Sequence, residues 1–248
     1  MTAAPTPIQT PTQAQAPTAA PAPHDPAEQL AAYRRSRAAI TALVAALPDP
    51  AAAPVPACPD WSARDLVGHL LHICASFVAL EDSQIDLAPV AAAPLAELLD
   101  RWAELDAELP AALERSPELR RRILLLDAFS HELDLRPAGR GPADPTGHPA
   151  FAGALDLSTM GFGQALAGAG LPALRIETAG RSWTLGAGAP AAVLRGPALD
   201  VFRSLTGRRT RAQIEALEWS GGPAGTWEPA FTWGPFAPPR AEVEPAGR

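Results

Sequence analysis

The sequence predicts an α+β protein in which a bundle of four helices precedes a smaller α/β domain. Between residues 25 and 136, apolar residues recur three and four positions apart in four stretches, as they do along one face of an amphipathic helix. After residue 173, short runs with β-branched or aromatic residues alternate with glycine-rich turns, a pattern typical of strands. The 248 residues, 47% of them hydrophobic, suffice for one large domain or two modest ones.

Capping residues indicate where the helices begin. Asp25 can cap the first helix, with Pro26 at its first position. Ser62 and Asp65 have the spacing of a capping pair at the start of the second helix. Residues 48–59 are rich in proline and predict an extended crossing between these helices. The four helices are expected at about residues 26–47, 62–85, 94–110 (bending or ending at Pro110) and 117–136.

Polar residues form one stripe on the fourth helix. Asp127, His131 and Asp134 follow one another at spacings of four and three, so their side chains project side by side. His69 lies on the apolar face of the second helix and would complete a set of three ligands around one ion. Three protein ligands leave a position open for water or substrate, as in catalytic zinc sites. Asp134 could then orient one of the ligands.

The same residues allow a purely structural interpretation. Inward-facing histidines are commonly hydrogen-bonded core residues, and an aspartate four positions before a histidine is a weak pattern by itself. Spacing alone therefore leaves metal binding and core hydrogen bonding as alternatives.

Two segments resemble a known family. The segment VPACPDWSARDLVGHL (residues 55–70) and the segment HELDL (residues 131–135) are similar to the two signatures of the mycothiol-dependent maleylpyruvate isomerase family. The N-terminal domain of that family is a DinB-like four-helix bundle that holds a divalent ion, usually zinc. The resemblance implies that His69, Asp127 and His131 are the metal ligands. The best-known member has the longer glutamate at the position of Asp127.

The C-terminal half resembles the small α/β domain of the same family. We expect a helix interrupted by glycines at 151–171, strands at 174–178, 182–185 and 191–195, and a helix ending at Gly207. The resemblance implies that Arg208 is a catalytic residue that contacts an anion near the domain interface. The alternative is an arginine that interacts with the end of its helix. The expected division is a disordered tail (1–24), the metal-binding bundle (25–148), the α/β domain (149–233) and a second disordered, proline-rich tail (234–248).

Composition excludes several classes of function. A net charge of −7 is poorly suited to neutralising phosphates, so nucleic acid is not expected as a partner. No apolar run is long enough to span a membrane and no signal peptide is recognisable, which predicts a cytoplasmic protein. The absence of lysine excludes Schiff-base and P-loop chemistry. Cys58 and Cys74 are expected as reduced, structural thiols, and His148 as a surface histidine.

Three functions fit these observations. In the first, the protein is an enzyme in which the ion activates a low-molecular-weight thiol, mycothiol according to the resemblance, for isomerisation or thiol transfer on a small-molecule substrate. In the second, it is a metal-dependent hydrolase, for which Glu132 or Asp134 would be the general base. In the third, it is a non-catalytic binding module braced by the ion.

Overall fold

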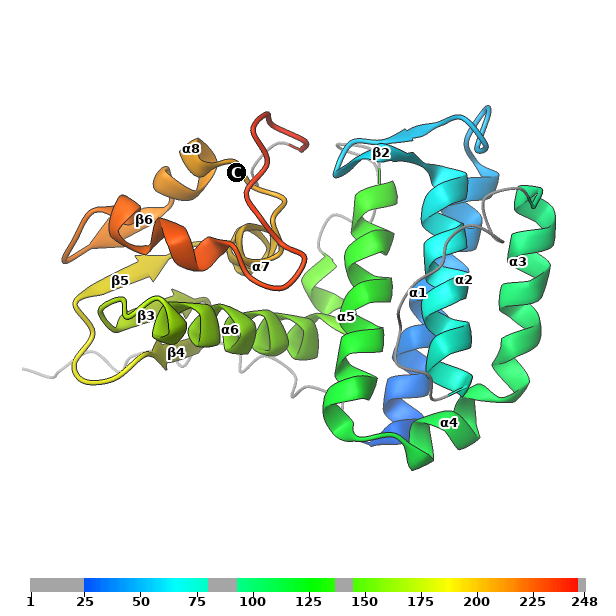
Figure 1. The fold of residues 1–248 in the computed structure, drawn as a ribbon, viewed down its shortest axis with the longest axis horizontal. Coiled ribbons are helices and arrows are strands. Elements are labelled where there is room, and N and C mark those ends of the chain that lie inside the picture. The colour runs from blue at the N-terminus through cyan, green and yellow to red at the C-terminus, as the bar shows by residue number, and fades with distance from the viewer. Residues whose placement is uncertain (1–24, 80–92, 137–144, 245–248) are drawn as a thin grey trace, which may run out of the picture.

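The computed structural model describes residues 25–79, 93–136 and 145–244. Figure 1 shows a group of upright helices formed by the N-terminal half and, beside it, a C-terminal part with a small sheet. The sheet is mixed and the rest of the described chain is largely helical, so the α+β class is confirmed. The expected tail 1–24 lies outside the described residues.

The described residues of the helical part form four main helices and one short helix. They are α1 (Pro26–Ala45), α2 (Ala63–Ala79), α3 (Leu95–Glu104), α4 (Leu109–Arg115) and α5 (Glu118–Leu135), with a 3-10 turn η1 (Leu105–Ala107) after α3. The expected third helix stops before Pro110, which instead lies in the first turn of α4. A proline is well tolerated there because the first helical N–H groups have no partner within the helix.

The predicted caps are present. The Asp25 carboxylate accepts a hydrogen bond from the N–H of Ala27 at 2.7 Å. At the start of α2, the Asp65 carboxylate accepts from the N–H of Ser62 at 2.9 Å, and the Ser62 hydroxyl accepts from the N–H of Asp65 at 3.2 Å. This reciprocal pair fixes the end of α2 from which His69 projects. Residues 80–85, expected to continue this helix, lie outside the described residues.

The extended crossing before α2 forms a hairpin. Strands β1 (Pro54–Val55) and β2 (Cys58–Ser62) pair in antiparallel fashion, and β2 runs directly into α2. Figure 1 shows this hairpin over one end of the helical part, beside the end of α5. The hairpin therefore brings Cys58 and Trp61 close to the C-terminal end of α5.

The C-terminal part packs one long helix and several short ones around a four-stranded sheet. The sheet order is β4-β3-β5-β6, with β3 parallel to β5 and the other pairs antiparallel. The elements are η2 (Pro145–Gly147), α6 (Phe151–Gly168), β3 (Leu174–Thr178), β4 (Arg181–Leu185), β5 (Ala192–Arg195), α7 (Ala198–Leu205), α8 (Arg211–Glu215), β6 (Glu218–Ser220) and η3 (Ala224–Phe231). Strand β6 was not expected from the sequence.

A tryptophan explains why α6 contains a glycine at its centre. A Cβ atom on Gly161 would lie 2.2 Å from the Trp233 ring, whose indole N–H donates to the carbonyl of Leu205 at 2.8 Å. The glycine lets the segment after η3 pack directly on the helix. The expected interruption of α6 does not occur, because the helix continues through its glycines.

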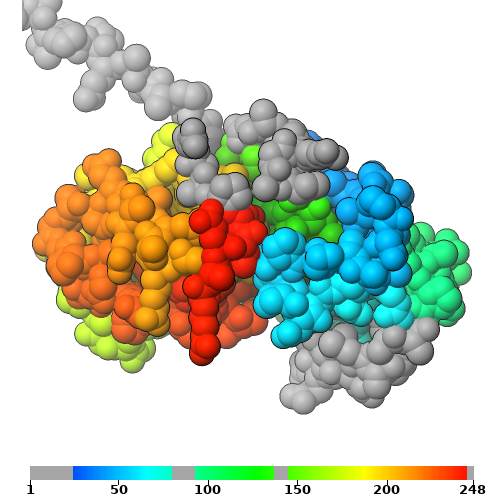
Figure 2. Space-filling view, turned by 90° about the horizontal axis from the view of Figure 1, so that it is seen from above, coloured from blue at the N-terminus to red at the C-terminus, as the bar shows by residue number. Residues whose placement is uncertain are grey.

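The expectation of a disordered tail from residue 234 is wrong for residues 234–244. The Glu244 carboxylate forms ion pairs with the buried side chains of Arg203 and Arg209. Figure 2 shows this last described segment, in red, lying between the C-terminal part and the hairpin. Proline-rich composition suggested disorder, but a carboxylate that neutralises buried arginines holds the segment in place. Residues 245–248 lie outside the described range.

Candidate metal centre

The three predicted metal ligands converge between α2 and α5. Nε2 of His69 lies 3.2 Å from Oδ1 of Asp127, and Nε2 of His131 lies 3.5 Å from the same oxygen. One ligand atom from each residue lies within 4.8 Å of the other two. Asp127 and His131 occupy consecutive turns of α5, and α2 packs against that helix. Two imidazoles and a carboxylate in this arrangement are a donor set that suits zinc.

Asp127 has an oxygen that the protein leaves available. Its Oδ2 atom is buried and finds no hydrogen-bond partner within residues 25–79, 93–136 and 145–244. A buried carboxylate oxygen without a partner is costly, and a cation is one way of satisfying it. Burial would raise the pKa of Asp127, but the hydrogen bond with His69 and the charge of His131 lower it, so the carboxylate form is favoured. The residues present therefore fit a divalent ion.

Trp61 covers one side of the histidines. The centroid of its ring lies 4.9 Å from that of His69 and 5.8 Å from that of His131. The indole is placed there because β2 ends at the cap of α2, one residue after Trp61. A partly buried aromatic ring at this position shields the imidazoles from water. This role of Trp61 was not predicted from the sequence.

Asp134 holds the far side of the His131 ring. Its Oδ2 atom lies 3.0 Å from Nδ1 of His131. A carboxylate at this distance favours the tautomer with the proton on Nδ1, which leaves the Nε2 lone pair facing Asp127. Burial would raise the pKa of Asp134, but the charges of Arg208 and Arg203 lower it well below its usual range. The carboxylate is therefore ionised where it meets the ring.

Arg208 lies at the junction between the helical and C-terminal parts. Its Nη2 donates to Oδ2 of Asp134 at 2.6 Å and its Nε donates to Oδ1 at 3.2 Å. Its Nη1 donates to the carbonyl of Thr206 at 2.6 Å. The anion that Arg208 contacts here is thus a carboxylate of the protein. A contact with a substrate anion remains a prediction from the resemblance.

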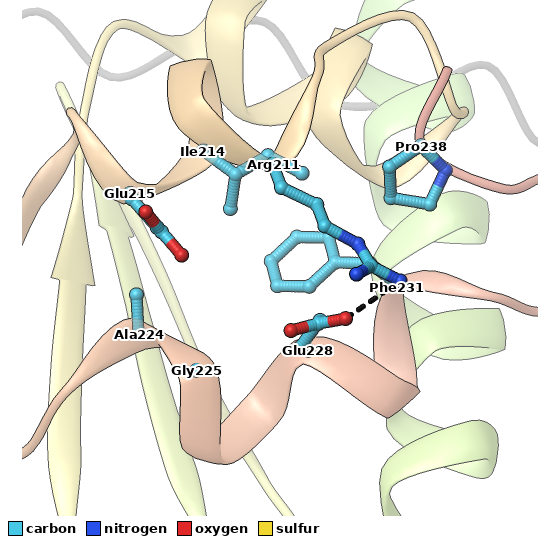
Figure 3. A pocket seen from close by; sticks show the side chains of 8 residues that line it. All are labelled: Arg211, Ile214, Glu215, Ala224, Gly225, Glu228, Phe231 and Pro238. Atoms are coloured by element: carbon cyan, nitrogen blue, oxygen red, sulfur yellow. Dashed lines mark ion pairs between the residues drawn. The ribbon is translucent and has the colours of Figure 1, made fainter. Parts of the chain in front are cut away.

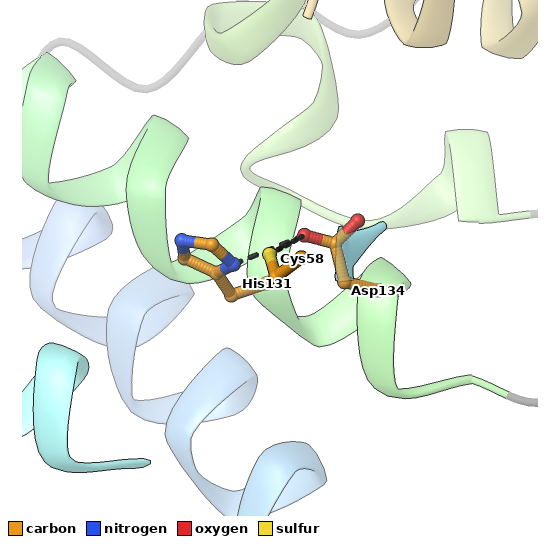
Figure 4. A group of neighbouring side chains, drawn as sticks. All are labelled: Cys58, His131 and Asp134. Carbon is orange, nitrogen blue, oxygen red and sulfur yellow. Dashed lines mark hydrogen bonds and ion pairs between the residues drawn. The ribbon is translucent and has the colours of Figure 1, made fainter. Parts of the chain in front are cut away.

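A second group of potential ligand atoms shares His131 with the first. It consists of Cys58, His131 and Asp134 (Figure 4). The Asp134 carboxylate is already paired with two arginines, and Sγ of Cys58 is 3.9 Å from it. Burial and the nearby Asp134 charge raise the pKa of the Cys58 thiol to about 12. Because the arginines already neutralise Asp134, the group containing Asp127 is the better candidate for holding an ion.

The prediction that His148 lies on the surface is wrong. Its side chain is buried, its ring stacks on Phe129 with centroids 4.8 Å apart, and its Nδ1 accepts a hydrogen bond from the N–H of Ala150 at 3.1 Å. Nε2 lies 3.5 Å from the buried carboxylate of Glu132, which also pairs with Arg136. The glycine-rich and proline-rich surroundings of His148 suggested an exposed loop, but its ring packs against α5 and is buried there.

The cavities differ in their distance from the candidate ligands. One of about 230 Å³ borders Asp134 and is otherwise lined mainly by the hairpin, the ends of α1 and α5, and the segment at Val243 and Glu244. A smaller pocket in the C-terminal part, with a volume of about 10 Å³, lies beside the Arg211–Glu228 ion pair (Figure 3). Its volume is about that of a single water site, so it is too small for a substrate.

Comparisons with known proteins agree with the family expected from the sequence. Residues 33–136 match the family model of the mycothiol maleylpyruvate isomerase N-terminal domain. No curated protein matches the chain. Two crystal structures are similar to it: that of the mycothiol-dependent maleylpyruvate isomerase, at 12% sequence identity, and that of a mutant of the same enzyme, at 11%.

Each of these similarities covers 80% of this chain and 94% of the other, with a TM-score of 0.57. At this identity the likeness establishes the fold. No helix in the described ranges combines the length and the apolar character needed to cross a membrane. Residues 33–136 belong to the mycothiol maleylpyruvate isomerase N-terminal domain family, and the chain as a whole has the maleylpyruvate isomerase fold.

Proposed function

We propose that this protein is a metal-dependent enzyme that uses mycothiol to isomerise, or to transfer the thiol to, an activated small-molecule substrate. The observation that carries the proposal is the convergence of His69, Asp127 and His131 on one point, with Oδ2 of Asp127 left without a partner among the described residues. The similarity to mycothiol-dependent maleylpyruvate isomerase supports the choice of thiol. The division into a metal-binding bundle (25–148) and an α/β domain (149–233) is part of the same proposal.

His69, Asp127 and His131 would hold the ion, most simply zinc, which would favour the thiolate form of a thiol bound beside it. Asp134 keeps the proton of His131 on Nδ1, so that the lone pair of Nε2 is available to bind the ion. Trp61 limits the access of water to the same histidines. The residues of the chain thus supply binding, orientation and exclusion of water.

The nucleophile is expected to come from outside the protein. Both cysteines have pKa values raised by burial, so neither is poised as a thiolate. In isomerisation, the sulfur of the added thiol would form a bond to one carbon of an activated double bond. Rotation about the resulting single bond and loss of the same sulfur would then return the thiol and the isomerised product. In transfer, the new carbon–sulfur bond would be retained, and the electron pair of the former double bond would take up, at the neighbouring carbon, a proton equivalent to the one that the thiol gave up.

Hydrolysis has less support because both general-base candidates are engaged. Glu132 is buried, ion-paired with Arg136 and faces His148. Asp134 is paired with Arg203 and Arg208 and meets His131. A general base must be free to take a proton from the water it activates.

The cavity of about 230 Å³ beside Asp134 is the candidate place for a small substrate or part of the thiol.

Calorimetric titration with mycothiol tests the proposal. Zinc-loaded wild-type protein should bind mycothiol, and His69→Ala should not. His72→Ala is the matched control, because His72 lies three residues further along α2 and faces Ser76 rather than the candidate centre. Maleylpyruvate is then supplied with and without mycothiol, and double-bond isomerisation is followed by absorbance. Equal binding by both histidine variants would contradict the proposal, and zinc binding without any thiol binding would favour a non-catalytic module.

A further inference from the structure

We propose that Arg203 is a positioning residue of the candidate metal centre, through which the C-terminal part of the chain controls how tightly the helical part binds its ion. The proposal rests on the proposed function, because it assumes that the ion binds at His131. Arg203 lies on α7, more than 70 residues after the last ligand in the sequence, and its side chain is completely buried. Its contact with the helical part was not predicted from the sequence.

The first step is the contact between Arg203 and the carboxylate that holds His131. Nη2 of Arg203 donates to Oδ1 of Asp134 at 2.6 Å, and Oδ2 of Asp134 lies 3.0 Å from Nδ1 of His131. Nη1 of Arg203 also donates, at 3.4 Å, to the carbonyl of Ser130, the residue before His131. Arg203 therefore holds both the carboxylate that faces the imidazole and the backbone from which the imidazole projects.

The second step is that Asp134 has no freedom to turn. Arg203 and Arg208 approach its two oxygens from the C-terminal part, and its side chain is 0% exposed. A rotation that improved one of these contacts would break another. The orientation of the His131 ring is consequently set by residues of α7 and of the turn that follows it.

The third step concerns what holds Arg203 itself. Its Nε donates to Oε1 of Glu244 at 2.5 Å and its Nη2 donates to Oε2 at 2.8 Å, which is a two-point contact. Arg209 shares Glu244 but pairs with Asp200 rather than with Asp134. The cluster balances three arginines with three carboxylates: Arg203, Arg208 and Arg209 with Asp134, Asp200 and Glu244. A series of contacts therefore connects Glu244 in the C-terminal segment to Arg203, Arg203 to Asp134, and Asp134 to His131.

The test compares Arg203→Lys with Arg209→Lys. A lysine keeps the charge but cannot make two-point contacts with a carboxylate. Loss of an outer partner of a metal ligand weakens binding by about 10- to 100-fold. Arg203→Lys loosens that partner, Asp134, without removing it, so the zinc dissociation constant should rise toward the lower end of this range, about tenfold. Arg209→Lys, which is also buried but does not reach Asp134, should stay close to wild type. Zinc affinity is measured by competition with a chromogenic chelator.

A second readout needs no metal. Long-range ¹H–¹⁵N spectra of the metal-free protein report the tautomer of His131, which should be the Nδ1–H form in the wild type and in Arg209→Lys. In Arg203→Lys the Nε2–H form should become populated, a change that a merely structural arginine would not cause. If Arg203→Lys does not fold, Glu244→Gln replaces it, because the variant loosens Arg203 at its partly exposed partner; the expected change has the same direction and a smaller size.

The outcomes separate this inference from the function on which it rests. Wild-type protein that does not bind zinc would overturn both. Wild-type protein that binds zinc, together with an unchanged affinity and an unchanged His131 tautomer in Arg203→Lys, would overturn the role of Arg203 alone.

Discussion

Nε2 of His69 lies 3.2 Å from Oδ1 of Asp127, so a hydrogen bond joins two helices through residues 58 positions apart in the sequence. The other carboxylate oxygen of Asp127 has no hydrogen-bond partner in the described part of the chain. A zinc ion that binds there, and does not bind the unfolded chain, would stabilise the folded state by about 2.7 kcal/mol when its free concentration is 100 times the dissociation constant. Zinc should therefore raise the melting temperature of the wild-type protein.

The same experiment with Asp127→Asn should show little or no shift, because an amide is a poor substitute for a carboxylate ligand. Asp156→Asn is the control: Asp156 is a half-buried carboxylate of the C-terminal part that pairs with Arg181. Its own melting temperature should change, but its zinc-induced shift should equal that of the wild type. An undiminished shift in Asp127→Asn would remove Asp127 from the ligand set.

Substitution of Cys58 distinguishes between the two groups of potential metal ligands, because Cys58 belongs to only one of them. If the ion binds at His69, Asp127 and His131, Cys58→Ser should retain one equivalent of zinc with nearly unchanged affinity. If it binds at Cys58, His131 and Asp134, the same variant should lose it. Because its pKa is raised to about 12, Cys58 should also react slowly with iodoacetamide at pH 7.5 and faster as the pH rises. Rapid alkylation at pH 7.5 would contradict this assignment of its environment.

His148 makes stability depend on pH. The pKa of its side chain is lowered from 6.5 to about 4, first by burial and then by the charges of Arg35 and Arg136. The unfolded chain therefore binds a proton at a higher pH than the folded protein does. The stability is complete above pH 6.5 and falls between pH 6.5 and 4, by about 1 kcal/mol per pH unit from this group.

Urea unfolding of metal-free wild type and His148→Gln at pH 7.5, 6.5 and 5.5 measures this effect. The difference in unfolding free energy between the two proteins should shrink as the pH falls, because the glutamine variant lacks the group that titrates. A difference that stays constant across the three pH values would show that His148 is not held in its neutral form by burial and by the charges of Arg35 and Arg136.

The contact between Gly161 and Trp233 can be tested without any ligand. Alanine normally favours a helix by about 1 kcal/mol over glycine, yet Gly161→Ala should destabilise the protein by about 1–3 kcal/mol because its Cβ would collide with the indole. Gly168 lies on the same helix, and a Cβ atom added there would meet nothing within 4 Å, so Gly168→Ala should be neutral or mildly stabilising. Equal effects of the two substitutions on urea unfolding would contradict the packing described.

Local signals in the sequence were sufficient for much of the helical part. The reciprocal pair of Ser62 and Asp65 predicted the start of α2, and the spacing of four predicted that Asp127 and His131 share a face of α5. These features depend on residues close together in the chain, where helix geometry fixes which side chains meet. The exception was Pro110, which was expected to bend or end the third helix. That helix, α3, already ends at Glu104, and Pro110 lies in the first turn of the next helix, α4.

The residues that surround the ligands could not be found in the same way. Arg203 meets Asp134 across 69 positions, and Glu244 meets Arg203 across 41, with no periodic pattern to indicate either contact. A weak signal was present for Arg203, since it is a positive charge within a short helix whose other residues are mostly apolar. The burial of His148 was not predicted, because composition indicates which residues form a loop better than it indicates which loop residues are covered by a helix.

The most direct test is the metal content of the purified protein after stripping and reloading with zinc, measured by mass spectrometry on the wild type and on His131→Ala. His131 belongs to both groups of potential ligands, so its loss removes every candidate site among the described residues. We expect one equivalent of zinc in the wild type and little in the variant. The absence of stoichiometric zinc from the wild type, or its retention by His131→Ala, would contradict the metal centre proposed here.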